Sequence, residues 1–181
     1  MTVKTPKDVR DFWFSDEMSK LWFEKSDQVD QRIKDEFSDT YEAAHAGKLE
    51  QWMDTPEDAL ALVITLDQFP RNIFRGTARA FESNDIALNY ARRSIDREDD
   101  KFVDPTRRQF FYLPYMHSEK LMDQNASVTF YEGLGNENSL RFAIAHRDVI
   151  EKFGRFPHRN APLARESTPE EIEYMETHKG F

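Results

Sequence analysis

The sequence predicts an all-α protein built from antiparallel helical hairpins in a bundle or a short superhelical stack. Apolar residues recur at helical spacing along the chain, and Ser or Thr followed by proline or an acid marks several helix starts. No run of β-branched residues alternates with a period of two, so we expect no sheet. Short turns between the helices favour antiparallel neighbours. The 181 residues suffice for one core, and we predict a single domain over 1–181.

The first two predicted helices have clear start and stop signals. Thr5 before Pro6 is typical of an N-cap followed by the first helical residue. A second helix is predicted over 26–46, because its apolar residues form one stripe with an acidic face opposite. Gly47 supplies the stop signal.

A third helix is predicted to lie at the centre of the fold. It starts with Thr55 and Pro56, which repeat the first start signal. Residues 59–66 are apolar on every side, a pattern typical of a helix enclosed by others. We expect the helix to end before Pro70, because proline disfavours helical geometry at the preceding Phe69.

Of the next two predicted helices, the first has a charged outer face and the second contains a proline. One starts at Ser83 or Asn84 and continues through Arg97. The other is predicted as one continuous helix over 104–124. Pro114 lies inside it and should kink it, because proline removes one backbone hydrogen bond.

The last part of the chain predicts two further helices. A loop over 133–136 precedes a helix over 138–153, which Gly154 ends. Thr168 before Pro169 then caps a short final helix. Five aromatic residues of the first half are predicted to be core rather than the lining of a groove, because aromatic residues at helical spacing are usually buried. They are Trp13, Phe14, Trp22, Phe23 and Trp52.

Composition and charge exclude several classes of function. Cysteine is absent, which rules out disulfides, thiolate metal sites and cysteine nucleophiles. The net charge of −9 repels polyanions, so we expect neither nucleic acid nor a membrane surface as a partner. The longest apolar run, 59–66, is too short to span a bilayer. We therefore expect a cytoplasmic protein.

The most specific candidate site lies in the one basic stretch without acids, over 152–165. Arg155, His158, Arg159 and Asn160 combine fixed charge, a titratable group and a carboxamide, and arginine forks match carboxylates and phosphates. The alternative is structural. In that case the arginines pair with the acid-rich N-terminal helices and Asn160 caps the loop.

A second candidate site follows the predicted central helix, where polar groups must find partners as the chain leaves the core. It comprises Asp67, Gln68, Arg71, Asn72 and Arg75. The alternative is a structural network in which Asp67 holds Arg71 at the four-residue spacing.

A third candidate is the tripeptide His117-Ser118-Glu119. Neighbouring residues on a helix do not face each other, so Ser118 and His117 are a poor nucleophile and base pair. On a continuous helix His117 and Glu119 lie about 200° apart, which opposes a shared metal ion. We predict no metal site, and a core histidine is the main alternative.

Four segments of the chain stand out as motifs. They are Asp11-Phe12-Trp13-Phe14, Leu66-Asp67-Gln68-Phe69-Pro70-Arg71-Asn72, Leu113-Pro114-Tyr115-Met116-His117-Ser118-Glu119 and Phe153-Gly154-Arg155-Phe156-Pro157-His158-Arg159-Asn160-Ala161. They resemble the signature blocks of the bacterial DUF924 family, in the family's order. The resemblance implies an all-helical fold similar to tetratricopeptide-repeat (TPR) proteins, and it implies no known activity, cofactor or partner. The chain departs from the family at Ala164, where glycine is usual, and at Pro162, where an aliphatic residue is usual.

Three hypotheses about function remain open at this point. We predict first a ligand- or peptide-binding module whose cleft holds an anionic small molecule or an acidic peptide end between the second and fourth blocks. The second is a small hydrolase or lyase that uses His117 or His158 with Glu119 or Asp67. The third is a purely structural or interaction protein. No cofactor is predicted under any of them. The oligomeric state stays open.

Overall fold

A computed structural model describes residues 2–178 and 180 of the chain. Its contacts divide the chain into two compact units, which are treated separately below. The N-terminal unit comprises Met1–Arg75 and Arg79–Pro114, and the C-terminal unit comprises Gly76–Ala78 and Tyr115–Phe181. The predicted single domain stays a prediction, because two compact units can belong to one domain.

The described part of the N-terminal unit is helical and contains no strand, which confirms the predicted all-α class. The TPR-like arrangement of the hairpins stays a prediction. The α-helices are α1 (Pro6–Trp13), α2 (Asp27–His45), α3 (Pro56–Asp67), α4 (Phe69–Ile73), α5 (Asn84–Asp96) and α6 (Pro105–Met116), whose last two residues belong to the C-terminal unit. Short 3-10 turns connect them at Met18–Lys20, Glu50–Asp54, Ala78–Phe81 and Asp99–Phe102.

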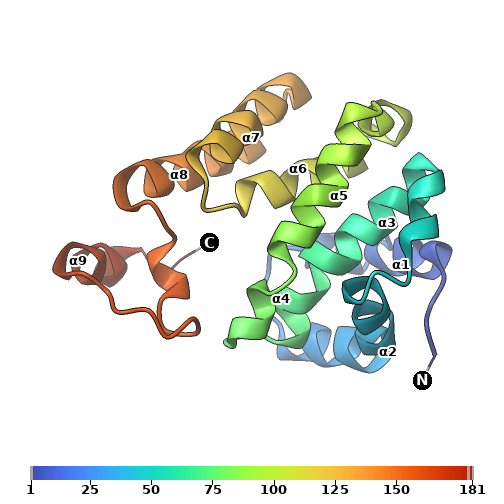
Figure 1. Ribbon diagram of the computed structural model, residues 1–181, viewed down its shortest axis with the longest axis horizontal. Helices are drawn as coiled ribbons and strands as arrows, with labels where there is room; N and C mark the ends of the chain where they lie inside the picture. The colour runs from blue at the N-terminus through green and yellow to red at the C-terminus, as the bar shows by residue number, and fades with distance from the viewer. Residues whose placement is uncertain (1, 179, 181) are drawn as a thin grey trace. The chain divides into compact units, whose positions relative to one another are not determined.

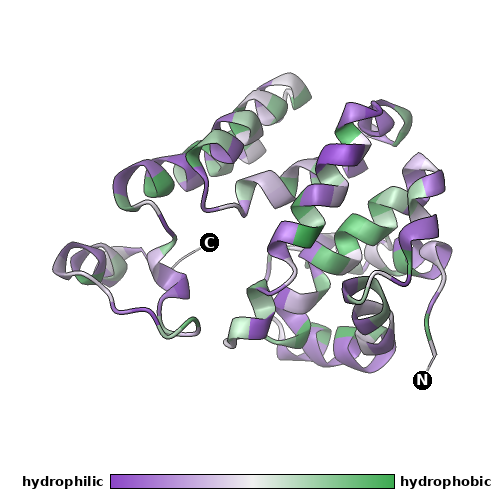
Figure 2. Ribbon diagram, viewed as in Figure 1, coloured by the Kyte–Doolittle hydropathy of each residue, from purple (hydrophilic) through white to green (hydrophobic). Residues whose placement is uncertain are grey.

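The helix α3 is the centre of the N-terminal unit, as predicted. Every residue from Ala59 to Asp67 is buried. The helices α1, α2, α4 and α5 all pack against it, and its ribbon is largely coloured as hydrophobic in Figure 2. Full burial of an aliphatic side chain contributes about 1.5–3 kcal/mol, so this helix holds much of the unit's hydrophobic stabilisation.

Four of the predicted start signals are confirmed by their caps, whereas Ser83 precedes α5 without a side-chain cap hydrogen bond. The side-chain oxygens of Thr5, Ser26 and Thr55 each accept a hydrogen bond from a backbone N–H in the first turn of the following helix. Each bond satisfies a donor that has no partner inside the helix. In the C-terminal unit Thr168 forms a full capping box with Glu171.

The C-terminal unit is built on a helical hairpin. The helices α7 (Leu121–Leu134) and α8 (Glu137–Phe153) lie side by side (Figure 1). Gly135 connects them with φ of 73°, a left-handed conformation that glycine adopts without steric cost. A 3-10 turn at Pro157–Arg159 and the helix α9 (Pro169–Thr177) follow. Phe156 lies in the small core of this unit together with Val149 and Ile150.

The predicted continuous helix over 104–124 is wrong, because the chain breaks after Met116 and resumes helical geometry at Leu121. The side-chain amide of Gln124 donates to the carbonyl oxygens of Met116 and Ser118, at 2.7 and 2.6 Å. These bonds satisfy carbonyl groups that lack helical partners and stabilise the break. His117 therefore lies in a turn and not on a helix.

Two smaller predictions also need correction. The third helix ends before Pro70 as predicted, but Phe69 is helical: it begins the short helix α4, in which Pro70 occupies the first turn, where no amide hydrogen is needed. Phe23 is 70 % exposed, so it is not a core residue, whereas Trp13 and Trp52 are buried as expected. None of the helices in the described residues combines the length and apolar character needed to cross a bilayer.

Candidate functional site

The structure places the candidate residues in two sets, one in each compact unit. The N-terminal set is Asp67, Gln68, Arg71, Asn72 and Arg75, and the C-terminal set is His117, Glu119, Arg155, His158, Arg159 and Asn160. The prediction that the two sets line one cleft stays a prediction. The contacts within each set are described in turn.

In the N-terminal set, Asp67 organises the end of α3. Its side chain is 1 % exposed and accepts a hydrogen bond from the amide of Gln68 at 2.6 Å. The Arg71 guanidinium lies 3.5 Å from the other carboxylate oxygen of Asp67, and it donates to the side-chain oxygen of Asn84 at 2.9 Å. The ion pair predicted between Asp67 and Arg71 is therefore present.

The other two residues of this set bind an acid on α2. Asn72 and Arg75 donate to the same carboxylate oxygen of Asp30, at 2.8 and 2.7 Å. Arg75 also donates through its Nε to the second oxygen, which makes the contact bidentate. Both side chains thus connect the α4 segment to α2, and their contacts are those of a structural tie.

In the C-terminal set, Arg155 and Asn160 bind the carboxylate of Glu171, which is 2 % exposed at the start of α9. Arg155 donates to both oxygens, at 2.7 and 2.8 Å, and the amide of Asn160 donates at 3.1 Å. The backbone N–H of Thr168 adds a further bond at 2.8 Å. Hydrogen bonding from Arg155 is the largest effect on this carboxyl and lowers the pKa of Glu171 from 4.5 to about 2.

Glu119 is held in the same way by a different arginine. Its carboxylate accepts from Nη1 and Nη2 of Arg165, at 2.8 and 3.0 Å, and from the backbone N–H of Phe156 at 2.8 Å. Partial burial raises the pKa of Glu119, but these hydrogen bonds outweigh it and the pKa is lowered. Arg165 also donates to the side-chain oxygen of Asn160 at 3.0 Å, so Asn160 joins the two ion pairs.

The remaining candidates gather around the buried ring of Phe156. The rings of His146 and His158 each lie 5.6 Å from it, centroid to centroid, and the guanidinium carbon of Arg159 lies 4.3 Å from its centre. The ring of His117 lies 6.4 Å from that of His146. We call His117, His146, His158 and Arg159 the imidazole cluster. Its members come from the turn after α6, from α8 and from the 3-10 turn after α8.

His146 has a defined protonation state within this cluster. Its Nδ1 lies 2.7 Å from the carbonyl oxygen of Phe142, and a carbonyl can only accept, so Nδ1 carries the hydrogen. Burial is the largest effect on this ring and, with the charges of His117, Arg159 and His158, lowers the pKa of His146 from 6.5 to about 3. His146 is therefore neutral at pH 7, with Nε2 as an acceptor.

Sequence reasoning missed three residues that organise these contacts. His146 had no recognisable signal, because a single histidine on a helix is common. Arg165 lies in the basic stretch that drew attention, and Glu171 lies in the recognised cap signal of the last helix. The predicted partners of Arg155 were acids of the N-terminal helices, but its partner is Glu171 of α9.

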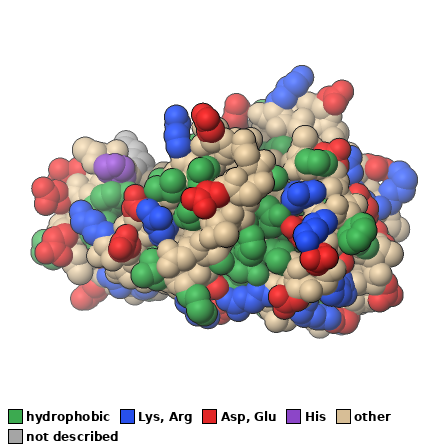
Figure 3. Space-filling view, turned by 90° about the horizontal axis from the view of Figure 1, so that it is seen from above, with side chains coloured by type: hydrophobic (Ala, Val, Ile, Leu, Met, Phe, Trp, Pro, Cys, Tyr) green, Lys and Arg blue, Asp and Glu red, His purple; other side chains and the backbone are tan. Residues whose placement is uncertain are grey.

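Two general features of the described residues complete the site. They contain no group of three or more His, Cys, Asp or Glu side chains arranged to hold a metal ion. Figure 3 shows basic and acidic side chains next to one another on the visible face, as expected from the many ion pairs.

These features define an all-helical protein whose polar blocks are tied by ion pairs, two of them to the buried carboxylates of Asp67 and Glu171, and which carries a histidine-rich cluster in its C-terminal unit. The chain belongs to the family described as "Bacterial protein of unknown function (DUF924)", which it matches over residues 9–179. A solved structure of a protein of unknown function from Agrobacterium tumefaciens is similar, with 41 % sequence identity and a TM-score of 0.91. The match covers 96 % of this chain and 97 % of that one. No curated protein is significantly similar to the chain.

Proposed function

We propose that the C-terminal unit binds a small anionic ligand at the imidazole cluster. The observation that carries this proposal is that His146, His158 and Arg159 lie against the ring of Phe156, with the ring of His117 next to that of His146. Such a group presents several N–H donors and positive charge to one place. Burial is the largest cause of the low pKa of His146, and the charges of His117, Arg159 and His158 lower it further, which agrees with positive charge gathered at this place.

The two ion pairs beside the cluster act as its frame in this proposal. Glu171 is engaged by Arg155 and Glu119 by Arg165, so neither carboxylate is left to repel an anion. This differs from the hypothesis based on the sequence, in which Arg155 itself grips the ligand. In this proposal Arg155 holds Glu171 in place through both carboxylate oxygens and does not contact the ligand.

The charge of the cluster restricts the kind of ligand. Arg159 carries a fixed positive charge, and histidine N–H groups are donors, so a ligand with several acceptor oxygens is favoured. Phosphate, citrate and sulfate are oxyanions with several such oxygens, whereas chloride is a single monovalent ion. The cluster should therefore prefer these oxyanions to chloride.

The test is the thermal stability of the full chain at pH 6.5 in sodium phosphate, sodium citrate, sodium sulfate or sodium chloride of equal ionic strength. A ligand that binds only the folded protein raises the melting temperature in proportion to its affinity. We expect phosphate, citrate and sulfate to raise it more than chloride does, and we expect this difference to fall in variants of the cluster. Equal melting temperatures in all four salts would refute the proposal.

Two variants and a matched control locate the effect. His158→Gln and Arg159→Gln should abolish the phosphate-dependent shift. Arg147→Gln, on α8 of the same unit, removes a cation from an exposed pair with Asp148 and should retain the shift. His158 is only half-buried, so its variant keeps the test valid if Arg159→Gln fails to fold.

The two alternatives have less support from the contacts. For acid–base catalysis, Glu119 is a poor partner for a histidine, because both of its oxygens are bonded to Arg165. The structural alternative agrees with the ties formed by Asp30, Asp67 and Glu171, and it predicts a large loss of stability in Asp67→Ala. That loss does not conflict with ligand binding in the other unit, so the phosphate experiment separates the two.

A further inference from the structure

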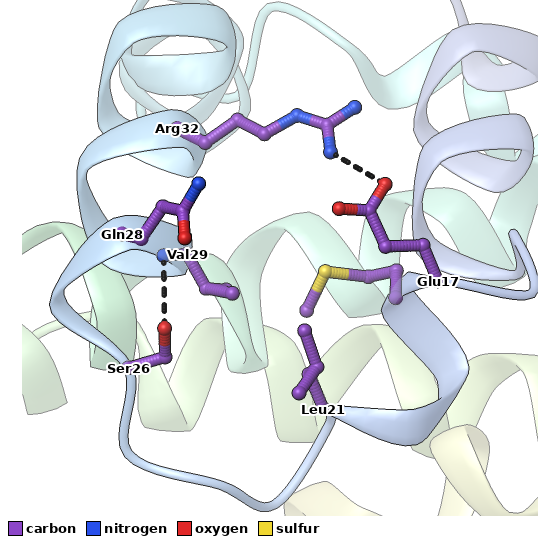
Figure 4. A pocket seen from close by; sticks show the side chains of 7 residues that line it. Glu17, Leu21, Ser26, Gln28, Val29 and Arg32 are labelled. Atoms are coloured by element: carbon purple, nitrogen blue, oxygen red, sulfur yellow. Dashed lines mark hydrogen bonds and ion pairs between the residues drawn. The ribbon is translucent and has the colours of Figure 1, made fainter.

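The N-terminal unit contains a second feature, a small pocket between the 3-10 turn Met18–Lys20 and the first turns of α2 (Figure 4). Its volume is about 80 Å³. One water needs roughly 10–15 Å³ on this measure, so the pocket holds about five to eight water-sized groups. That is the size of an aliphatic amino-acid side chain with part of its backbone.

The floor of the pocket is apolar. It is formed by Met18, Leu21 and Val29, of which Met18 and Val29 are buried. The N-cap of α2 closes one side of the pocket, where Ser26 Oγ accepts a hydrogen bond from the backbone N–H of Val29 at 3.3 Å. A hydrocarbon group placed here leaves water and contacts these side chains, which is favourable in proportion to the area buried.

The rim of the pocket carries one charge of each sign. Arg32 Nη1 donates to Glu17 Oε2 at 3.2 Å, and Arg32 Nε donates to Glu36 at 3.0 Å. Neither bond uses Arg32 Nη2 or Glu17 Oε1, so each partner keeps one group for a ligand. Figure 4 shows the two side chains facing each other on the same side of the pocket, with Leu21 and Val29 beyond them.

Arg32 is held in place for this role. Its guanidinium lies over the ring of Phe12, with 4.9 Å between its central carbon and the ring centre. Together with its bonds to Glu36 and Glu17, this contact fixes a long side chain before a ligand arrives, which lowers the entropic cost of binding. The side chain is still 46 % exposed, so a ligand can reach it.

We propose that this pocket binds a free aliphatic α-amino acid such as leucine or valine. Arg32 binds the carboxylate, Glu17 binds the ammonium group, and Met18, Leu21 and Val29 contact the side chain. Of the side chains that line the pocket, Glu17 is negative and Arg32 is positive, which matches the two charges of a zwitterion; Glu36 is bonded to Arg32 from outside the lining. Glu17 repels a ligand with only a carboxylate, and Arg32 repels one with only an ammonium group.

Calorimetric titration of the full chain with leucine and three analogues tests the proposal. Leucinamide lacks the carboxylate, 4-methylpentanoate lacks the ammonium group, and glycine lacks the side chain. We expect leucine or valine to bind at least about tenfold more tightly than each analogue, because each removes one set of contacts. No heat of binding for leucine and valine, or equal affinity for leucine, leucinamide and 4-methylpentanoate, would overturn the proposal.

Variants connect the binding to the rim. Arg32→Gln and Glu17→Gln should each weaken leucine binding at least about tenfold, since each removes a charged partner. Both residues are exposed, so the variants should fold. Lys7→Gln removes a cation from the exposed pair with Asp11 on α1 and should bind leucine like the parent. Unchanged leucine binding in Arg32→Gln would refute the proposed role of Arg32. These titrations do not depend on whether the imidazole cluster binds an anion.

Discussion

Glu119 and Arg165 form a two-pronged ion pair across 46 positions of sequence, with N···O distances of 2.8 and 3.0 Å. The pair connects the turn after α6 to the segment that follows the imidazole cluster. Asn160 joins it to the pair of Arg155 and Glu171. The polar residues of the C-terminal unit therefore form one connected network.

Arg165→Ala should destabilise the protein, because it leaves the half-buried Glu119 carboxylate without its main partner. Each side chain is about a quarter exposed, at 24 % and 26 %, so solvent offsets part of the loss. We expect the free energy of unfolding in urea to fall by about 1–3 kcal/mol. Arg147→Ala, which removes an exposed pair on α8, should change it by less than about 0.5 kcal/mol. Equal losses in the two variants would contradict the structural role of Arg165.

Ala164→Gly should stabilise the protein. Ala164 has φ of 52°, a left-handed conformation that costs an alanine about 1–2 kcal/mol. Glycine removes that strain but adds about 0.4–1 kcal/mol of unfolded-state entropy. We expect a net gain of about 0.5–1 kcal/mol in urea unfolding. Ala161→Gly, at a nearby exposed position without positive φ, should give no gain.

His146 should make stability depend on pH below neutrality. Its pKa falls from 6.5 to about 3 on folding, so the unfolded state binds the proton more readily. The stability associated with the neutral His146 ring is fully present above pH 6.5. It is lost as the pH falls toward 3, with a slope of up to about 1.4 kcal/mol per pH unit. His146→Leu should reduce the slope of unfolding free energy between pH 6.5 and 4.5. His178→Gln changes an exposed histidine of the same unit and is the control, so an unchanged slope in His146→Leu would count against a buried neutral ring.

The ionised carboxylate of Glu171 should stabilise the folded protein, and this stabilisation should be lost at a lower pH than that associated with His146. Its pKa is lowered from 4.5 to about 2, so the folded state favours the carboxylate. The stabilisation is present above pH 4.5 and is lost as the pH falls toward 2. Glu171→Gln should unfold more readily than the parent at pH 6, by about 1–3 kcal/mol, and the difference should shrink in acid. Circular dichroism during acid titration measures both. Glu173→Gln, an exposed acid on the same helix, should follow the parent.

Several parts of the fold could be predicted because they depend on local chemistry. Thr5, Ser26 and Thr168 are caps by virtue of their own side chains and the following turn. The burial of α3 follows from an apolar run with no polar face to expose. The sequence also drew attention to Ala164 through its resemblance to the family, but the positive φ of this residue came from the structure.

Other features depend on residues far apart in the sequence and could not be predicted. The helix break after Met116 is stabilised by the side-chain amide of Gln124, and nothing in the sequence distinguishes Gln124 from an ordinary helical residue. The starts of α1, α2, α3 and α9 were set by the sequence alone, because caps and prolines act within a few positions, whereas α4 and the separate helix α7 were not predicted. Only the tertiary structure decided which acid each arginine binds and that His146 lies beside Phe156. Those choices depend on packing that brings distant segments together and removes their charges from water.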